Sequence, residues 1–178
     1  MDRHTVSSDY LGDDPYGNPV YDTVRSPLGE QLFQLKYRQD KTAVRPIVEV
    51  AVRFLNSWKP DVQLLLPTPP SNEDRRVQPV HMIAEAMATE AGIEFCDTCL
   101  SKTGSTAELK NVHVYSERVK VLRGIFSVIE ERDEGRGVLV LDDLFPSGAT
   151  LSALTESLYN CRVRDVFVMT ITKTRVRS

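Results

Sequence analysis

The spacing of apolar residues along the chain predicts helices that alternate with strands. Between residues 44 and 58 apolar side chains recur every three or four positions, as on one helix face, and a similar stripe covers residues 80–91. A shorter stripe at residues 28–37 follows Ser26-Pro27, which is typical of a helix start. Short apolar runs typical of strands occur at residues 62–66, 93–96, 125–128, 138–141 and 165–172. This alternation predicts an α/β fold: a central, mostly parallel sheet with helices on both faces.

The stretch from Val138 to Leu158 combines a buried strand, two carboxylates, a turn of small residues and a helix. Asp142 and Asp143 follow the apolar run, and the turn from Ser147 to Thr150 precedes the helix. Free amides at a helix N-terminus bind anions, whereas carboxylates suit hydroxyl groups or a metal. A ligand that carries both a phosphate and a diol, such as a ribose 5-phosphate, would satisfy both halves. The alternative is an Asp-Asp turn followed by an ordinary helix cap.

Composition narrows the class of protein. The 178 residues suit one domain, 41% of them are hydrophobic, and the formal net charge of −3 gives no nucleic-acid signal. No apolar run is long enough for a membrane span, and the polar N-terminus lacks a signal-peptide core, so we expect a cytoplasmic protein. Three cysteines, an odd number, argue against a disulfide framework. Cys96 and Cys99 have zinc-ligand spacing, but no second ligand pair accompanies them.

The segment Asp142-Asp143-Leu-Phe-Pro-Ser-Gly-Ala-Thr150 resembles the phosphoribosyl-pyrophosphate (PRPP) loop of type I phosphoribosyltransferases. The resemblance implies that the two aspartates hold the ribose hydroxyls and associate with Mg²⁺ through water or substrate. It also implies that Ser147, Gly148, Ala149 and Thr150 hold the 5-phosphate. Phe145 and Pro146 are expected among the substrate-binding residues, with Phe145 packed against an acceptor ring or else part of the core. Pro146 departs from the family pattern, because proline has no amide to donate. It also stands where hypoxanthine-guanine members carry an aspartate that acts on the base.

Two further segments support the resemblance. Leu66-Pro67-Thr-Pro69-Pro70-Ser71, followed by Arg76-x-Gln78-Pro79, looks like the ComF-like (competence-protein) group of this family. This likeness implies that Pro70, Ser71 and Arg76 meet the pyrophosphate; the alternative is a solvated basic pair at Arg75-Arg76. The polar stretch 97–118 occupies the place of the family's flexible loop. The resemblance implies that three residues of this stretch contact the pyrophosphate: Lys102, Lys110 and Arg118. It gives the two lysines a catalytic role. The alternative is a loop that is merely solvated.

The resemblance covers roughly residues 25–175 and defines the predicted organisation. We expect a flexible N-terminal arm at residues 1–22 and a phosphoribosyltransferase domain with a small N-terminal hood at residues 23–178. The implied activity is transfer of a 5-phosphoribosyl group from PRPP to a nitrogen nucleophile, with release of pyrophosphate and Mg²⁺ as cofactor. The sequence does not identify the acceptor molecule, and it leaves open whether the protein forms a homodimer. The alternative is a PRPP-binding regulatory or adaptor protein without turnover, linked to DNA uptake or nucleotide metabolism.

Overall fold

The computed structural model describes residues 2–70, 77–102, 117, 122, 125–128, 135–145 and 148–174. The helices are α1 (Pro27–Tyr37), the 3₁₀ turn η1 (Lys41–Ala43), α2 (Val44–Trp58), α3 (Pro79–Ala91) and α5 (Ala149–Asn160). The strands of the N-terminal half are β1 (Asp2–Arg3), β2 (Thr5–Asp13), β3 (Pro19–Arg25) and β4 (Leu64–Pro67). Those that follow are β5 (Glu94–Phe95), β6 (Leu100–Lys102), β7 (Phe126–Val128), β8 (Gly137–Phe145) and β9 (Asp165–Lys173).

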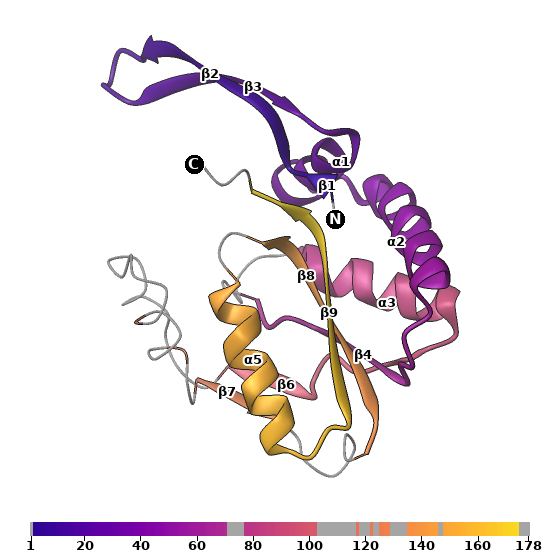
Figure 1. Ribbon diagram of the computed structural model, residues 1–178. Coiled ribbons are helices and arrows are strands. Elements are labelled where there is room, and N and C mark those ends of the chain that lie inside the picture. Colours follow the sequence, from indigo (N-terminus) through magenta and orange to yellow (C-terminus); the bar gives the residue numbers. More distant parts are fainter. Residues whose placement is uncertain are drawn as a thin grey trace.

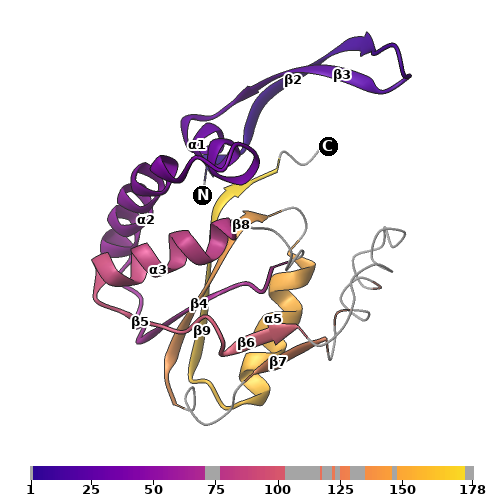
Figure 2. The same cartoon turned by 180° about the vertical axis from the view of Figure 1, so that it is seen from behind.

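The main sheet is parallel and has the strand order β1-β9-β8-β4-β5. The helices α1, α2 and α3 cover one face of this sheet, and α5 covers the other (Figures 1 and 2). The predicted α/β architecture, with helices on both faces of a parallel sheet, is therefore confirmed. Because parallel strands end at the same edge, the segments that follow β4, β8 and β9 all leave the sheet there.

Alternating residues of β8 build two separate cores. Leu139 and Leu141 pack with the buried faces of α1, α2 and α3, whereas Val138 and Val140 pack with α5 and with Phe126 of β7. All four side chains are fully buried, as expected for a central strand of a sheet covered on both faces. Each contributes roughly 1.5–3 kcal/mol of transfer free energy. Both cores therefore pack against the first half of β8, and its carboxyl end, from Asp142 to Phe145, is partly buried.

The N-terminal arm differs from its prediction, because residues expected to lack regular structure form an antiparallel hairpin of β2 and β3. This hairpin projects from the body beside α1 (Figure 1). Asp14 shapes its connecting loop by accepting hydrogen bonds from the amides of Tyr16 and Asn18, both at 2.8 Å. The sequence pattern did not predict these strands, because two bulges break the alternation that a strand normally shows. The division at residue 22 stays a prediction.

Two other expectations are corrected. Cys96 and Cys99 form a disulfide, although the odd number of cysteines argued against a disulfide framework: two cysteines three positions apart form one local link that does not include Cys161. The stretch expected to be loop from residue 97 onward contains β6, which pairs antiparallel with β7.

No helix of the described chain has the length and apolar character needed to cross a membrane.

Candidate functional site

The acidic pair lies near the carboxyl end of β8, where the sequence placed it, but the strand continues past it to Phe145. Asp142 pairs in register with Thr170 of β9, and Phe145 pairs with Lys173. Successive side chains of a strand point to opposite faces of the sheet. Asp142 therefore follows Val140 onto the α5 face, and Asp143 follows Leu141 onto the face covered by α1. The two carboxylates thus meet different surroundings.

Asp142 is held in a polar row that crosses three strands. Its Oδ1 accepts hydrogen bonds from Thr68 Oγ1 and from the Asp143 amide, both at 2.9 Å. Burial, followed by the nearby Asp143 charge, raises the pKa of Asp142 to about 6. On the other side, the hydroxyl of Thr170 is buried and has no hydrogen-bond partner in the described part of the chain. A ligand hydroxyl placed here could bond to both the carboxylate and Thr170.

Asp143 is paired with a cation from the N-terminal half of the chain. Lys36 of α1 donates a hydrogen bond from Nζ to Asp143 Oδ2 at 2.6 Å, and the two side chains are only 23% and 13% exposed. Beside them, Thr172 Oγ1 donates to the Asp143 carbonyl at 3.3 Å and lies 3.2 Å from His4 Nδ1. Burial lowers the pKa of His4, and the nearby cations Arg25 and Lys36 lower it further. His4, which follows β1, and Lys36 of α1 therefore cover this side of the site.

The N-terminus of α5 provides an anion-binding end. Gly148 is the N-cap residue with φ of +76°, and no side chain caps this end of the helix. A Cβ atom at this position would lie 2.7 Å from Cζ of the Phe145 ring, so both the backbone angle and the packing require glycine. The amides of the first turn have no partner within the helix, and the helix dipole favours negative charge there. This geometry fits a phosphate.

The predicted site residues divide into three groups. Asp142, Asp143, Phe145, Gly148, Ala149 and Thr150 lie together on the β8–α5 connection, with Ala149 buried and Thr150 exposed. Pro70 follows β4 at the same edge of the sheet, while Lys102 ends β6 in the small antiparallel sheet. The remaining residues lie outside the described ones: Ser71, Arg76, Lys110, Arg118, Pro146 and Ser147.

Several side chains around the acidic pair were not predicted. Thr68 and Thr170 are the first polar residues on their strands' carboxyl ends, a position that could have drawn attention to them. Lys36 and His4 gave no such signal, because each lies more than a hundred residues from its partner in sequence. Only the folded chain brings them to Asp143 and Thr172.

The donor set does not amount to a protein-built metal cage. Among the residues that the structure describes, no group of three or more histidine, cysteine, aspartate or glutamate side chains could hold a metal ion. Mg²⁺ commonly uses one or two carboxylates together with waters and substrate phosphates. Because Asp143 is paired with Lys36 on the other face of the sheet, Asp142 is the carboxylate of the pair that could contact an Mg²⁺ ion arriving with a phosphorylated ligand.

Comparison with solved structures assigns the fold. One adenine phosphoribosyltransferase aligns with a TM-score of 0.55 at 10% identity, over 94% of this chain and 85% of its own. The adenine phosphoribosyltransferase of Thermoanaerobacter pseudethanolicus aligns with a TM-score of 0.53 at 14% identity, over 93% and 83%. The fold is that of the phosphoribosyltransferases.

The Saccharomyces cerevisiae adenine phosphoribosyltransferase, crystallised with adenine and an imino-altritol bisphosphate, shares this fold with a TM-score of 0.51. It is 11% identical over 94% of this chain and 84% of its own. By sequence, no family model and no curated protein matches the chain. The likeness therefore lies in the phosphoribosyltransferase fold.

Proposed function

We propose that this protein is a PRPP-dependent phosphoribosyltransferase that transfers the 5-phosphoribosyl group to a nitrogen nucleophile and releases pyrophosphate. One observation carries the proposal. A carboxylate suited to sugar hydroxyls and an uncapped helix N-terminus suited to a phosphate lie on one strand–helix connection, at Asp142 and Gly148. Ribose 5-phosphate carries both groups. The phosphoribosyltransferase fold supports the same reading.

In this proposal, different residues bind the 5-phosphate, the ribose and the pyrophosphate of PRPP. The first-turn amides of α5, with the hydroxyls of Ser147 and Thr150, hold the 5-phosphate. Asp142 accepts hydrogen bonds from the ribose hydroxyls, and Thr170 donates or accepts one beside it. Asp143 lies next to Asp142 at the end of the strand, and its ion pair with Lys36 avoids an isolated buried anion there. Bound Mg²⁺ supplies positive charge to the pyrophosphate leaving group.

The leaving-group side of the site involves residues of two other segments. We assign pyrophosphate contacts to Pro70, Ser71 and Arg76 after β4, and to Lys102, Lys110 and Arg118 in and beyond β6. The assignment rests on the likeness of the segment from Leu66 to Pro79 to the ComF-like group, and on the position of Pro70 after β4 at the carboxyl edge of the main sheet. Excluding water from this side would protect the activated sugar from hydrolysis.

Pro146 restricts the choice of acceptor. Proline cannot take or give a proton, so this position does not assist a purine nitrogen as an acidic side chain would. We therefore assign an acceptor that needs no proton transfer from this position, which disfavours a salvage enzyme of the hypoxanthine-guanine type. The class of acceptor beyond a nitrogen nucleophile is not assigned.

Calorimetric titration with PRPP and Mg²⁺ tests the binding site. We expect saturable binding to the wild type, and at least a tenfold weaker affinity for Asp142→Asn. Asp9→Asn, an exposed change on the hairpin, serves as the matched control and should bind as the wild type does. A folded wild-type protein that does not bind PRPP would overturn the proposal.

A second candidate is a PRPP-binding regulatory or adaptor protein without turnover. The Lys36–Asp143 ion pair favours it, because it occupies a carboxylate that the resemblance assigns to the ribose. Pyrophosphate release separates the two functions. Release in the presence of ammonia or a free nucleobase supports the transferase, whereas tight PRPP binding without release from any acceptor in the panel supports the regulatory protein.

A further inference from the structure

The disulfide between Cys96 and Cys99 lies where two sheets meet. Cys96 continues the pairing of β5 with β4, since its amide donates a hydrogen bond to the Leu65 carbonyl at 3.2 Å, and Cys99 directly precedes β6. Among the strands that the structure describes, β6 pairs only with β7, so no backbone ladder joins this small sheet to the main one. The bridge therefore shortens a joint that otherwise consists of Asp97 and Thr98 alone.

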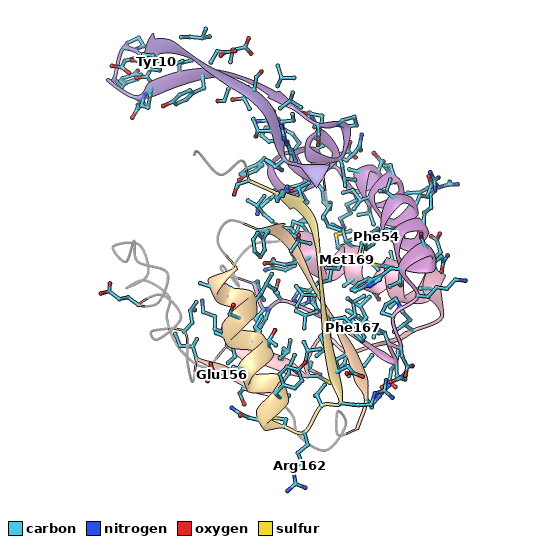
Figure 3. All side chains as sticks on the ribbon, viewed as in Figure 1. Tyr10, Phe54, Glu156, Arg162, Phe167 and Met169 are labelled. Atoms are coloured by element: carbon cyan, nitrogen blue, oxygen red, sulfur yellow. A yellow bond between two sulfur atoms is a disulfide. The ribbon has the colours of Figure 1, made fainter. Side chains whose placement is uncertain are left out.

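Both sulfur atoms belong to the core on the α5 face of the main sheet. Cys96 and Cys99 are 7% and 1% exposed, and they share this core with apolar residues of β4, β7 and β8. Phe167 and Met169 of β9 mark the opposite face, which α2 covers (Figure 3). The two residues between the cysteines are exposed, so the bridge lies just below the surface. Of the two sulfur atoms, that of Cys96 is the more accessible from solution.

The loop that this disulfide closes is too short for a large structural effect. A disulfide stabilises a fold mainly by restricting the unfolded chain, and the effect grows with the length of the closed loop. Here the two cysteines are only three positions apart. Cys-x-x-Cys is instead the spacing of dithiol–disulfide exchange sites, and this pair follows a βαβ unit formed by β4, α3 and β5.

The hydroxyl of Thr98 favours the reduced form of Cys96. Thr98 Oγ1 lies 3.7 Å from Cys96 Sγ, and because a disulfide sulfur has no proton, the hydroxyl is the donor of this contact. A hydroxyl bonds a thiolate more strongly than a disulfide, because the thiolate carries a full negative charge. Thr98 therefore stabilises the Cys96 thiolate that forms when the bridge opens and that attacks when it closes again.

We propose that Cys96 and Cys99 form a reversible redox site that thiol reductants open. A thiolate of the reductant attacks Cys96 Sγ, the S–S bond breaks, and Cys99 leaves as a thiolate that takes up a proton. A second reductant thiol attacks the mixed disulfide, which releases the Cys96 thiol and the oxidised reductant. Two electrons and two protons thus pass from two thiols to the pair. Opening the bridge unlinks the end of β5 from the start of β6 and loosens the β6–β7 sheet.

Thiol counting in glutathione buffers tests the redox site. The native protein is equilibrated at several ratios of reduced to oxidised glutathione, then unfolded in N-ethylmaleimide and analysed by mass spectrometry. We expect one alkylated cysteine, Cys161, under oxidising conditions and three under reducing conditions, with conversion in both directions while circular dichroism shows a folded protein. A structural disulfide resists reduction by glutathione. A pair that stays oxidised in reduced glutathione, or opens only when the chain unfolds, therefore overturns the proposal.

Thr98→Val tests the part that we assign to the hydroxyl. Without this donor, half-reduction should require a glutathione ratio about two- to tenfold more reducing. Thr89→Val is the matched control, because the Thr89 hydroxyl donates to the Glu85 carbonyl on α3, and it should leave the ratio unchanged. Equal ratios in the two variants overturn the role of Thr98.

Hydrogen exchange measures the loosening of the small sheet without any ligand. The amides of β6 and β7 should exchange about tenfold faster in the reduced protein and in the double variant Cys96→Ala/Cys99→Ala, whereas those of β8 should exchange as before. Exchange in β6 and β7 that is unaffected by reduction would show that the bridge does not hold this sheet, and would overturn that part of the proposal.

A consequence for PRPP binding rests on the proposed function. β6 ends at Lys102, which we assign to the pyrophosphate, so the oxidised protein should bind PRPP with Mg²⁺ about threefold or more tightly than the reduced protein. Calorimetry on both redox states measures the ratio, and the double variant should bind equally under both conditions. Equal affinities of the two wild-type states overturn this link. Absence of binding in both states is a failure of the proposed function alone, because thiol counting still decides the redox site.

Discussion

At the scale of single residues, the two adjacent aspartates have acquired different properties. Asp143 faces the ammonium group of Lys36, whereas Asp142 has only hydrogen-bond donors as close partners among its described contacts. Burial therefore disfavours the charge of Asp142, and the neighbouring Asp143 adds repulsion. One carboxylate of the pair is thus permanently compensated, while the other titrates within reach of neutral pH.

The raised pKa of Asp142 predicts a stability loss as pH rises. The folded protein binds this proton with a pKa of about 6, against 3.8 ordinarily. The stabilisation of the folded protein by this bound proton is thus fully present below about pH 4 and is lost as pH rises through about 6. Relative to Asp142→Asn, the wild type should lose up to about 3 kcal/mol of unfolding free energy between pH 4 and 7. Urea unfolding of both proteins at several pH values measures this difference.

Asparagine is a suitable replacement because its amide oxygen still accepts the bonds from Thr68 and the Asp143 amide. Asp9→Asn, exposed on the hairpin, controls for a general effect of removing one carboxylate. A difference between wild type and Asp142→Asn that does not change with pH would show that Asp142 titrates as an ordinary surface aspartate does.

At the scale of elements, the β8–α5 connection depends on Gly148. Alanine there must adopt φ of +76° and displace the Phe145 ring, which lies 2.7 Å from the Cβ position. The backbone angle costs about 1–2 kcal/mol and the overpacking about 1–3 kcal/mol more. We therefore expect Gly148→Ala to lower the free energy of unfolding by about 2–5 kcal/mol, and to weaken PRPP binding.

Gly92 offers a matched control for the backbone angle. It has φ of +68° at the end of α3, and a Cβ atom there would meet nothing within 4 Å. Gly92→Ala should thus show only the angular cost of about 1–2 kcal/mol in urea unfolding. Equal losses in the two variants would mean that Phe145 moves aside without cost.

Elements with a regular apolar period were predictable, and those without one were not. The stripes of α2 and α3 and the apolar run of β8 were each identified near their observed bounds. The β2–β3 hairpin was missed because bulges disturb its alternation and most of its side chains are exposed on both faces. The continuation of β8 to Phe145 was missed as well, because pairing with β9 keeps polar residues in the strand.

At the scale of the whole molecule, one ion pair ties the N-terminal helix to the site. Lys36 of α1 and Asp143 of β8 are 107 residues apart in sequence and both largely buried. Lys36→Met leaves the carboxylate without its cation, and should lower the free energy of unfolding by about 1–3 kcal/mol. Urea unfolding measures the loss.

Arg45→Met is the matched control, because Arg45 pairs with Glu49 at the surface, where the two side chains are 87% and 50% exposed. Its loss should stay within about 0.5 kcal/mol. Adding Asp143→Asn to Lys36→Met should restore part of the stability, since no unpaired charge remains. A Lys36→Met variant as stable as Arg45→Met would contradict a structural role for the pair.

The amino-acid sequence by itself determined the alternation of helices with β4, β5, β8 and β9 and the position of the strand–acidic pair–helix connection, because these depend on local periodicity and on neighbouring residues. Only the tertiary structure decided which faces the two aspartates meet, that Lys36 and Thr68 lie beside them, and that β1 pairs with the end of β9. Those features arise from contacts between segments distant in sequence, and a local pattern carries no information about them. The local pattern thus located the site, and long-range packing set its charge.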